Sequence, residues 1–576
     1  MRHFRLLAVS AFALAAAPLA AQTAPAFDAN RLKQHIRILS SDAYEGRAPA
    51  TRGEQMTVDY IAKQFQAAGL QPGGEVIDGK RQWTQRVPLL KSDIVGAPQL
   101  QLNLGNGQTQ SLTQGEQIAV RAPMNGQTSV SLANVPLVFV GYGVSAPERS
   151  WDDFKGQDVR GKLLVVLVND PDFEGGEGDF GGKAMTYYGR WTYKYEEAAR
   201  RGAAGVLIVH ETEPASYGWA TVKNSNTNTM FDIVRTDPAA RHTAFESWIQ
   251  RPLAEQIFAA SGLDFERAKA AARTRVFQPI PLKATLSANL QARTETITSY
   301  NVAGILPGTR YPDETVIFTA HHDHLGIGEP DANGDRIFNG AVDNATGTSH
   351  LIEQGRAFAR LPRTERSILF LAVGAEEKGL LGSEYYARNP LYPLAKTVAV
   401  LNTDSMSVWG RARDFSISGT ARLNLLDLLI AEAQRQGRSF TPDPRPEAGG
   451  FFRSDHFPFA KVGVPAVSLT PGRNLVNGGL ARGNALAADY TAKRYHQQDD
   501  EYDPSWDLSG MTQDAQMLHL VARRLANSRD WPNWSQDSEF RAVRDQSAAE
   551  RGAAAPAPGT PVPPAPEPQP GKGERG

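Results

Sequence analysis

The 576-residue chain contains no cysteine. This absence excludes disulfide scaffolds, cysteine-based zinc sites, iron–sulfur clusters and thiol nucleophiles, so a transition-metal site must be built from histidines and carboxylates. An excess of charge is lacking as well, because 61 Lys and Arg face 62 Asp and Glu. That balance removes the electrostatic argument for a nucleic-acid or polyanion binder. With 41% hydrophobic and 21% charged residues, the composition is typical of a globular protein with a sizeable core.

Long hydrophobic runs are also scarce, and the clearest one lies at the start of the chain. Residues 1–21 place two arginines ahead of an apolar stretch and small residues, which predicts a secretory signal peptide cleaved near Ala21, with Ala24 and Ala26 as alternatives. The apolar stretch is short for a membrane span, and no other segment suits one, so we expect an exported, soluble protein of the periplasm or the cell exterior. Residues 547–576 are rich in Pro, Ala and Gly and predict a disordered tail.

Between these two ends the hydrophobic pattern divides the chain into three stretches. Residues 22–129 begin with two amphipathic helical patterns, and we assign them to the amino-terminal part of the main domain. Residues 130–285 contain three buried-strand patterns and a helical one, which predicts a small inserted α/β domain. Residues 286–530 alternate strands with helices, which predicts an α/β fold whose mixed, largely parallel sheet is flanked by helices.

Chemically active side chains follow the apolar runs of this last stretch. Three runs are followed directly by histidine or acidic residues: His321 with Asp323, Glu376 with Glu377, and Asp404. Sites in open α/β sheets lie outside the carboxyl ends of the strands, so we expect these side chains to meet at one edge. In an extended segment His321 and Asp323 face one way and His322 and His324 the other. Adjacent carboxylates repel each other unless a cation neutralises them or one holds a proton.

Two further residues are ambiguous on their own. Asp343 lies in a turn where a helix cap or Asx-turn is the ordinary explanation, and His496 lies in a polar loop that suits a surface histidine. Taken together, two histidines and three carboxylates suffice for two metal sites sharing one aspartate: His321, Asp343, Glu377, Asp404 and His496. Two divalent ions, these carboxylates and one hydroxide sum to zero charge. Nitrogen and oxygen donors make zinc the leading metal, with cobalt or manganese as substitutes, and Glu376 remains as general base.

The motifs in order resemble the M28 family of co-catalytic zinc aminopeptidases. They are HHD, GAVDNATG, GAEEKGLLGSEYY, LNTDS, SDHFPFAKVGVPA and YHQQDDEYD, together with EGRAPATRGE near the amino terminus. The inserted stretch is similar to the protease-associated (PA) domain of exported family members. Two small departures, AVDN and HHD in place of commoner variants, remove no ligand position. The resemblance implies the zinc-exopeptidase fold, two zinc ions per chain, and cleavage of peptides that have a free amino terminus.

The resemblance also implies a role for each metal ligand. His321 and Asp404 hold one zinc, Glu377 and His496 hold the other, and Asp343 bridges the two ions.

It further implies the roles of the catalytic residues. Glu376 deprotonates the bridging water and passes the proton to the leaving amine, and Asp323 orients the metal-binding histidine. Tyr495 helps to stabilise the tetrahedral oxyanion. The Asp343–Asn344 peptide matches one that is cis in the family.

Three other functions remain open from the sequence. A carboxypeptidase of the glutamate carboxypeptidase type needs a basic pocket for the substrate carboxylate, which Arg453 or Arg473 could supply. A glutaminyl cyclase shares the fold but uses a single zinc, so the intact HxD motif counts against it. A receptor-like protein without catalysis is expected to lack ligands or the base, and here none is missing.

Overall fold

The computed structural model describes residues 25–175, 178–420 and 422–551. The predicted signal peptide, 1–21, and most of the predicted tail lie outside these ranges. Residues 548–551 form a short 3-10 helix in which Arg551 is buried, so the start of the predicted tail packs against the protein. No helix in the described ranges is long and apolar enough to cross a membrane.

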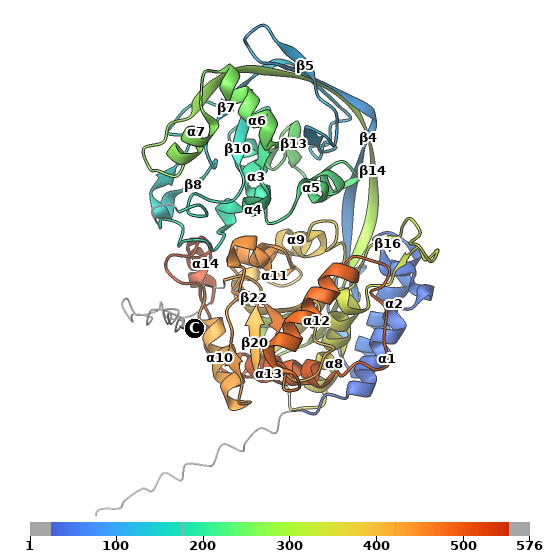
Figure 1. Cartoon of the computed structure of the whole chain (residues 1–576). Helices are drawn as coiled ribbons and strands as arrows, with labels where there is room; N and C mark the ends of the chain where they lie inside the picture. The colour runs from blue at the N-terminus through green and yellow to red at the C-terminus, as the bar shows by residue number, and fades with distance from the viewer. Residues whose placement is uncertain (1–24, 176–177, 421, 552–576) are drawn as a thin grey trace, which may run out of the picture.

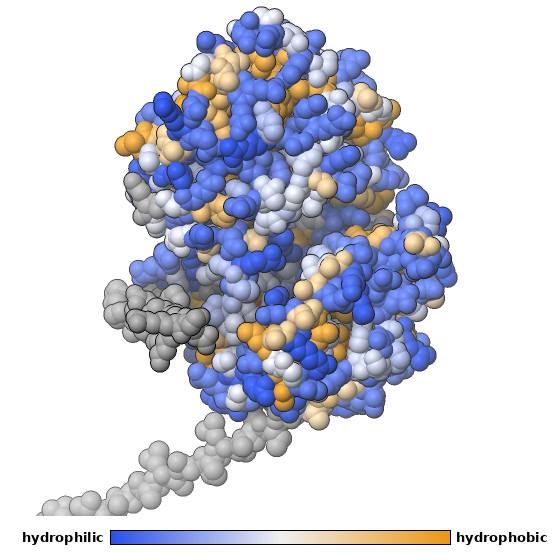
Figure 2. Space-filling view, in the orientation of Figure 1, coloured by the Kyte–Doolittle hydropathy of each residue, from blue (hydrophilic) through white to orange (hydrophobic). Residues whose placement is uncertain are grey.

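Two lobes share a pair of very long strands, β4 (Thr84–Asn103) and β14 (Ile280–Leu306), which arch between them (Figure 1). These strands pair antiparallel along most of their length. At its carboxyl end β14 pairs with the sheet of the larger lobe, and at its amino end it pairs with the sheet of the inserted lobe. The two sheets are therefore continuous through one strand. Figure 2 shows a mostly hydrophilic surface on both lobes and a hollowed waist between them.

The larger lobe has the predicted mixed, largely parallel sheet. Four strands are parallel neighbours in the order β22 (Ala466–Pro471), β19 (Thr397–Thr403), β15 (Tyr311–His321) and β18 (Arg366–Val373). β14 pairs antiparallel with β18 at one side, and β20 (Asp414–Ile417) and β21 (Ser439–Phe440) complete the other. The predicted fold class is confirmed.

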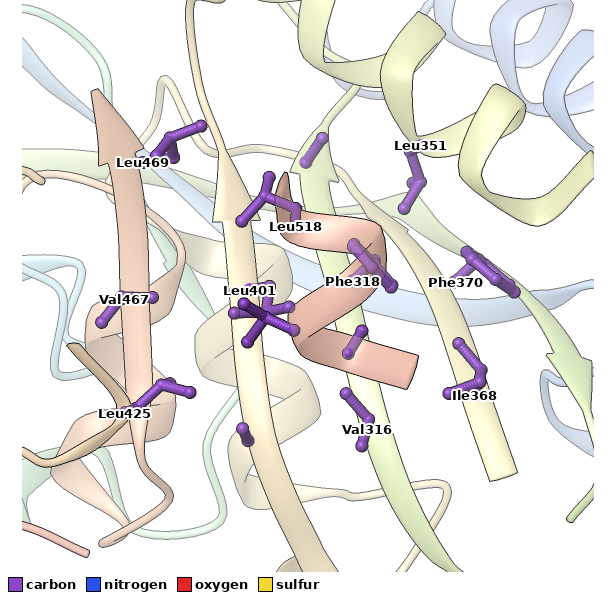
Figure 3. Close-up of a cluster of buried hydrophobic side chains, with 14 of the residues drawn as sticks. Val316, Phe318, Leu351, Ile368, Phe370, Leu401, Leu425, Val467, Leu469 and Leu518 are labelled. Carbon is purple, nitrogen blue, oxygen red and sulfur yellow. The ribbon is translucent and has the colours of Figure 1, made fainter. Parts of the chain in front are cut away.

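Helices cover both faces of this sheet, which explains why its strands are apolar throughout. Along β15, Phe318 faces a core shared with α2, α8, α10 and α13, whereas Ile317 faces a second core shared with α9 and α11. Figure 3 shows the first of these cores, in which leucines of α8, α10 and α13 meet the strand side chains. The helices of this lobe are α1 (Ala29–Leu39), α2 (Arg52–Ala68), α8 (Gly347–Ala359), α9 (Leu381–Arg388), α10 (Leu425–Arg435), α11 (His456–Lys461), α12 (Gly479–Lys493), α13 (Ser509–Ala526) and α14 (Arg541–Gln546).

The two amphipathic patterns near the amino terminus correspond to α1 and α2. The predicted faces are buried, as Ile36 in α1 and Phe65 in α2 illustrate. Thr51 caps α2 by accepting a hydrogen bond from the amide of Glu54, and Gly69 ends the helix with a φ of 90°. A left-handed residue at this position suits glycine, so the local sequence specifies where α2 stops.

The inserted lobe has its own largely parallel sheet. Its neighbours in order are β7 (Ser129–Phe139), β10 (Leu163–Leu167), β11 (Gly205–His210), β13 (Phe245–Gln250) and β6 (Ile118–Val120), the last of them antiparallel. Its helices are α3 (Trp191–Arg200), α4 (Thr212–Ala215), α5 (Trp219–Asn226), α6 (Arg251–Ala260) and α7 (Phe265–Ala271). The shorter strands of the chain include β5 (Thr109–Ser111), β8 (Ser145–Ala146), β9 (Trp151–Asp152), β12 (Met230–Ile233), β16 (Gly326–Ile327) and β17 (Ile337–Phe338).

This lobe begins earlier than the predicted residue 130. Leu100, Leu102 and Ile118 pack in its core rather than in the core of the larger lobe. The alternating polar and apolar pattern of this stretch predicts strands with one buried face, but it does not indicate which lobe that face covers.

Candidate active site

The site lies at the carboxyl edge of three adjacent parallel strands. β15 ends at His321, β18 ends shortly before Glu376 and Glu377, and β19 ends one residue before Asp404. Because these strands are parallel neighbours, their ends bring the side chains to the same place. Asp343 comes from the turn that precedes α8.

The five predicted ligands form an alternating series of acidic and imidazole groups. His321 Nε2 lies 3.2 Å from Asp404 Oδ1 and 3.2 Å from Asp343 Oδ1. His496 Nε2 lies 3.3 Å from Asp343 Oδ2 and 3.1 Å from Glu377 Oε2. The two oxygens of Asp343 therefore face different histidines, so Asp343 occupies the centre of the series.

The donor set fits divalent metal ions. Ligand atoms of His321, Asp343 and Glu377 lie within 4.8 Å of one another, as do those of His321, Glu376 and Asp404. Carboxylates gathered in this way repel one another unless cations neutralise them. The two groups share His321 and lie side by side, and their donors are nitrogen and oxygen atoms. Donors of these types suit zinc.

Glu376 and its neighbour Glu377 differ in the residues they contact and in the direction in which their carboxyl pKa is shifted. Glu377 contacts His496 and also His324, and the pKa of its carboxyl falls below its usual range despite burial, because these imidazoles favour the charged form. The pKa of Glu376 is raised well above its usual range by burial and by the charges of Glu377 and Asp404. The two adjacent acids therefore occupy different environments.

Asp323 contacts the turn that carries both glutamates. Its carboxylate accepts hydrogen bonds from the amides of Glu376 and Glu377, at 3.0 and 3.3 Å. The same carboxylate lies 3.8 Å from His321 Nδ1, whereas the Asp323 carbonyl oxygen is closer to that nitrogen, at 3.2 Å. Asp323 thus holds the glutamate turn with its side chain and meets the imidazole mainly with its backbone.

Tyr495 lies at the open side of the site. Its ring stacks on His496 with centroids 3.9 Å apart, and 43% of the residue is exposed. Within the described ranges its hydroxyl has no hydrogen-bond partner, so it is free to contact a substrate. The expected cis peptide is present between Asp343 and Asn344.

The structure adds residues that the sequence reasoning missed. Buried Arg47 donates hydrogen bonds to carbonyl groups of His322 and Gly340 and so joins the amino-terminal segment to the floor of the site. The carboxylate of Asp500 accepts hydrogen bonds from the backbone amides of Val342 and Asp343, each at 3.0 Å. Both residues lie in motifs quoted above, EGRAPATRGE and YHQQDDEYD. The sequence therefore marked their positions but did not indicate which groups they contact.

His324 corrects an expectation based on strand geometry. It was expected to face away from His321, yet its Nδ1 lies 2.7 Å from Glu377 Oε1. Strand β15 ends at His321, so side-chain alternation does not continue to residue 324. His456, another histidine of the motifs, is buried edge-on against Phe451, with ring centroids 4.6 Å apart.

The segment before α11 supports the Asp404 side of the site. The hydroxyl of Ser454 donates a hydrogen bond to Asp404 Oδ2 at 2.7 Å. The side-chain amide of Asn402 donates in turn to the Ser454 hydroxyl, also at 2.7 Å. Arg453, the preceding residue, donates from Nη2 to Ser216 Oγ of the inserted lobe at 2.8 Å. Arg473 is exposed and its side chain has no ion pair within the described ranges.

Comparison with known proteins finds a family model and curated relatives that match part of the chain. Residues 301–520 match the model of peptidase family M28. Aminopeptidase NAALADL1 of Mus musculus is 35% identical over 145 residues, which cover 24% of this chain and 18% of that protein. Aminopeptidase YwaD of Bacillus subtilis (strain 168) is 29% identical over 179 residues, covering 30% of this chain and 35% of that protein. The chain therefore spans about a fifth to a third of the length of these curated relatives.

A solved structure also aligns with most of the chain. The aminopeptidase from Aneurinibacillus sp. strain AM-1 has 18% identity and a TM-score of 0.47, and the alignment covers 88% of this chain and 95% of that one. The region matched by the family model contains all five predicted ligands, from His321 to His496. Residues 301–520 of this chain are thus similar to peptidase family M28.

Proposed function

We propose that this protein is an exported aminopeptidase that uses two zinc ions to hydrolyse the amino-terminal peptide bond of peptides. The observation that carries the proposal is the position of Asp343, whose two oxygens face His321 and His496 at 3.2 and 3.3 Å. A shared aspartate between two histidines is the arrangement that two adjacent ions need. Two relatives with partial matches, NAALADL1 and YwaD, are named aminopeptidases, which supports the same reaction.

The donor atoms divide into two sets. His321 and Asp404 would hold one zinc, Glu377 and His496 would hold the other, and Asp343 would contact both. When bound, the zinc pair supplies Lewis acidity, which polarises the scissile carbonyl and lowers the pKa of water.

The remaining residues provide proton transfer and orientation. We assign Glu376 as the base that accepts a proton from the attacking water and later donates it to the leaving amine, so that no net proton is consumed. Asp323 holds the glutamate turn through two amide hydrogen bonds and so keeps Glu376 in place. The free hydroxyl of Tyr495 is suited to donate a hydrogen bond to the oxyanion that develops on the substrate carbonyl.

The alternatives are separated by specific features. A single-zinc cyclase has no use for the His321–Asp404 half of the donor set, and a receptor-like protein has no use for Glu376. A carboxypeptidase is favoured by one observation, the presence of Arg453 next to the Asp404 side of the site. That alternative requires an N-acyl dipeptide, whereas an aminopeptidase requires a free amino group.

The decisive experiment compares these substrates on the purified mature protein. We expect hydrolysis of Leu-p-nitroanilide and no hydrolysis of an N-acyl dipeptide, with loss of activity on chelation and recovery with zinc or cobalt. Cleavage of the N-acyl dipeptide alone would instead identify a carboxypeptidase. Amino-terminal sequencing of protein from the periplasm or medium tests export, and a chain starting near residue 22 is the expected result.

A further inference from the structure

His324 is buried beside the predicted metal ligands without being one of them. Among the described residues, neither of the two groups of close donor atoms includes it. Its Nδ1 nevertheless lies 2.7 Å from Glu377 Oε1. The ligand imidazoles lie farther from their carboxylate neighbours, at 3.1 to 3.3 Å. His324 therefore makes the tightest imidazole contact of the site from outside the donor set.

This contact is the one hydrogen bond of the His324 ring within the part of the chain that the structure describes. Its other nitrogen, Nε2, is buried and has no partner among those residues. Neighbouring His322, by contrast, has its Nε2 at 2.8 Å from the carbonyl oxygen of Tyr300, which is a structural contact. Burying an imidazole is unfavourable unless its polar atoms are paired. The bond to Glu377 is thus what accounts for a histidine at position 324.

The chemistry of the partner fixes the direction of this hydrogen bond. A carboxylate that binds a metal ion is ionised, and an ionised carboxylate can only accept hydrogen bonds. Nδ1 of His324 therefore carries a proton and donates it to Glu377 Oε1.

The ring of His324 is held in place by its neighbours. It meets the ring of His496 edge-on, with centroids 5.7 Å apart. It also lies against Gly340, where an added Cβ atom would come within 2.6 Å of the ring atoms Cγ and Cδ2. The carbonyl oxygen of Gly340 accepts a hydrogen bond from Arg47 at 2.8 Å, which fixes that side of the contact. The ring is therefore packed between a predicted ligand and the turn that leads to Asp343.

The two outer carboxylates of the donor series are held in the same way. In Asp404, Oδ1 faces a ligand imidazole, and Oδ2 accepts a hydrogen bond from Ser454 at 2.7 Å. In Glu377, Oε2 faces a ligand imidazole, and Oε1 accepts from His324 at 2.7 Å. Each of them thus has one oxygen held from outside and one turned toward the metal donors. Partners of this kind orient metal-binding carboxylates and raise metal affinity.

We propose that His324 is a positioning residue for one of the two metal positions: its Nδ1–H holds one oxygen of Glu377 so that the other, together with His496, is presented to the ion. The inference rests on the proposed two-zinc function. Without this donor the carboxylate is free to rotate, and the loss of that freedom opposes metal binding. His324 acts through Glu377, so it affects the affinity of one ion rather than proton transfer.

The test is the affinity of each zinc ion for the full mature protein, measured as zinc bound per chain over a series of free zinc concentrations. His324→Ala is expected to raise the Kd of one ion by about tenfold to a hundredfold, the usual effect of losing a partner of a metal ligand. The Kd of the other ion should not change. Because every ligand is retained, excess zinc should restore two bound ions and most of the kcat on Leu-p-nitroanilide.

Two further variants separate the hydrogen bond from the bulk of the ring. The amide nitrogen of Asn lies the same number of bonds from Cα as Nδ1 of His, so His324→Asn should keep Kd values close to those of the wild type. His324→Gln carries its amide farther along the side chain and should behave like His324→Ala.

His519→Ala is the matched control. It removes another buried imidazole, whose Nδ1 lies 3.1 Å from Gln354 Oε1, away from the predicted ligands. It should keep both zinc affinities, whatever its effect on the unfolding midpoint.

Unchanged affinities for both ions in His324→Ala would overturn the inference, as would a His324→Asn protein that binds zinc no better than His324→Ala. One ion lost from His324→Ala even in excess zinc would also overturn it, because His324 would then be a ligand. Fewer than two zinc ions in the wild-type protein, or no hydrolysis of Leu-p-nitroanilide by it, is the separate result that rejects the proposed function itself.

Discussion

The two lobes share an architecture and a strand, yet they treat buried charge in opposite ways. In the inserted lobe, buried Lys194 donates hydrogen bonds to three carbonyl oxygens, those of Tyr142, Asn169 and Tyr188, at 2.6 to 2.9 Å. The side-chain amide of Asn169, which follows β10, likewise donates to the carbonyl oxygen of Pro214 at 2.9 Å. In the larger lobe, by contrast, acidic side chains after the strands lie close to one another and to the histidines His321 and His496.

The contrast separates a structural polar cluster from a functional one. Buried polar groups that satisfy one another stabilise a single conformation and need nothing from outside. Buried carboxylates that face each other are complete only when cations join them. The parallel sheet brings polar strand ends together in both lobes, and the balance of charge at those ends decides which of them becomes a site.

The largest expected effect removes the centre of the donor series. Asp343→Ala should lower bound zinc from two ions per chain and abolish activity, because it takes an oxygen from each metal position. Asp404→Ala should do less damage, since it affects one position. Elemental analysis with activity assays checks both, and Asp158→Ala, on the exposed surface, is the control. Full metal content and rate in Asp343→Ala would contradict the shared role.

Glu376→Gln sharpens the same comparison within the active site. Gln keeps the shape of Glu376 but cannot accept the proton, so kcat should fall by about 10²–10⁴ while zinc content and fold are retained. Glu377→Gln, its neighbour, should lose metal instead. If Glu376→Gln keeps most of the wild-type kcat, another group is the base, and if it loses zinc, the two glutamates have exchanged roles.

Lys194→Met tests whether the buried polar cluster of the inserted lobe serves stability rather than catalysis. Leaving buried carbonyl groups without their donor should reduce the free energy of unfolding by about 3 kcal/mol. The kcat/KM of the folded protein on Leu-p-nitroanilide should stay near that of the wild type, because Lys194 contacts only its own lobe. The midpoint of thermal unfolding measures the first effect. An unchanged midpoint would show that water replaces the ammonium group.

The smallest effect is expected at the carboxyl end. Ending the chain after Arg551 removes only Pro- and Ala-rich sequence, and the unfolding midpoint should not change. Ending it after Arg544 should lower the midpoint slightly, because Arg551 is buried and donates a hydrogen bond to the Arg544 carbonyl. Equal midpoints for the two truncations would show that residues 548–551 contribute nothing to stability.

Much of the site was predictable because its residues follow strands that the sequence marks clearly. Apolar runs of strand length, each followed by His or acidic residues, place His321, Glu376 and Asp404 at one sheet edge without any structure. His324 was predicted wrongly, because the alternation of side chains depends on where β15 ends. Arg47 was not assigned, because its partners are backbone carbonyl groups remote in sequence.

The sequence by itself determined the chemistry: the absence of cysteine, the ligand types, their order along the chain and the helix-stopping role of Gly69. These follow from local patterns, since each depends on residue type and short spacing. Only the tertiary structure decided that residues near Leu100 belong to the inserted lobe and that Arg453 of the larger lobe donates a hydrogen bond to Ser216 of the inserted lobe. Both facts depend on how β4 and β14 place one lobe against the other, and long-range packing of this kind leaves no periodic signal in the sequence.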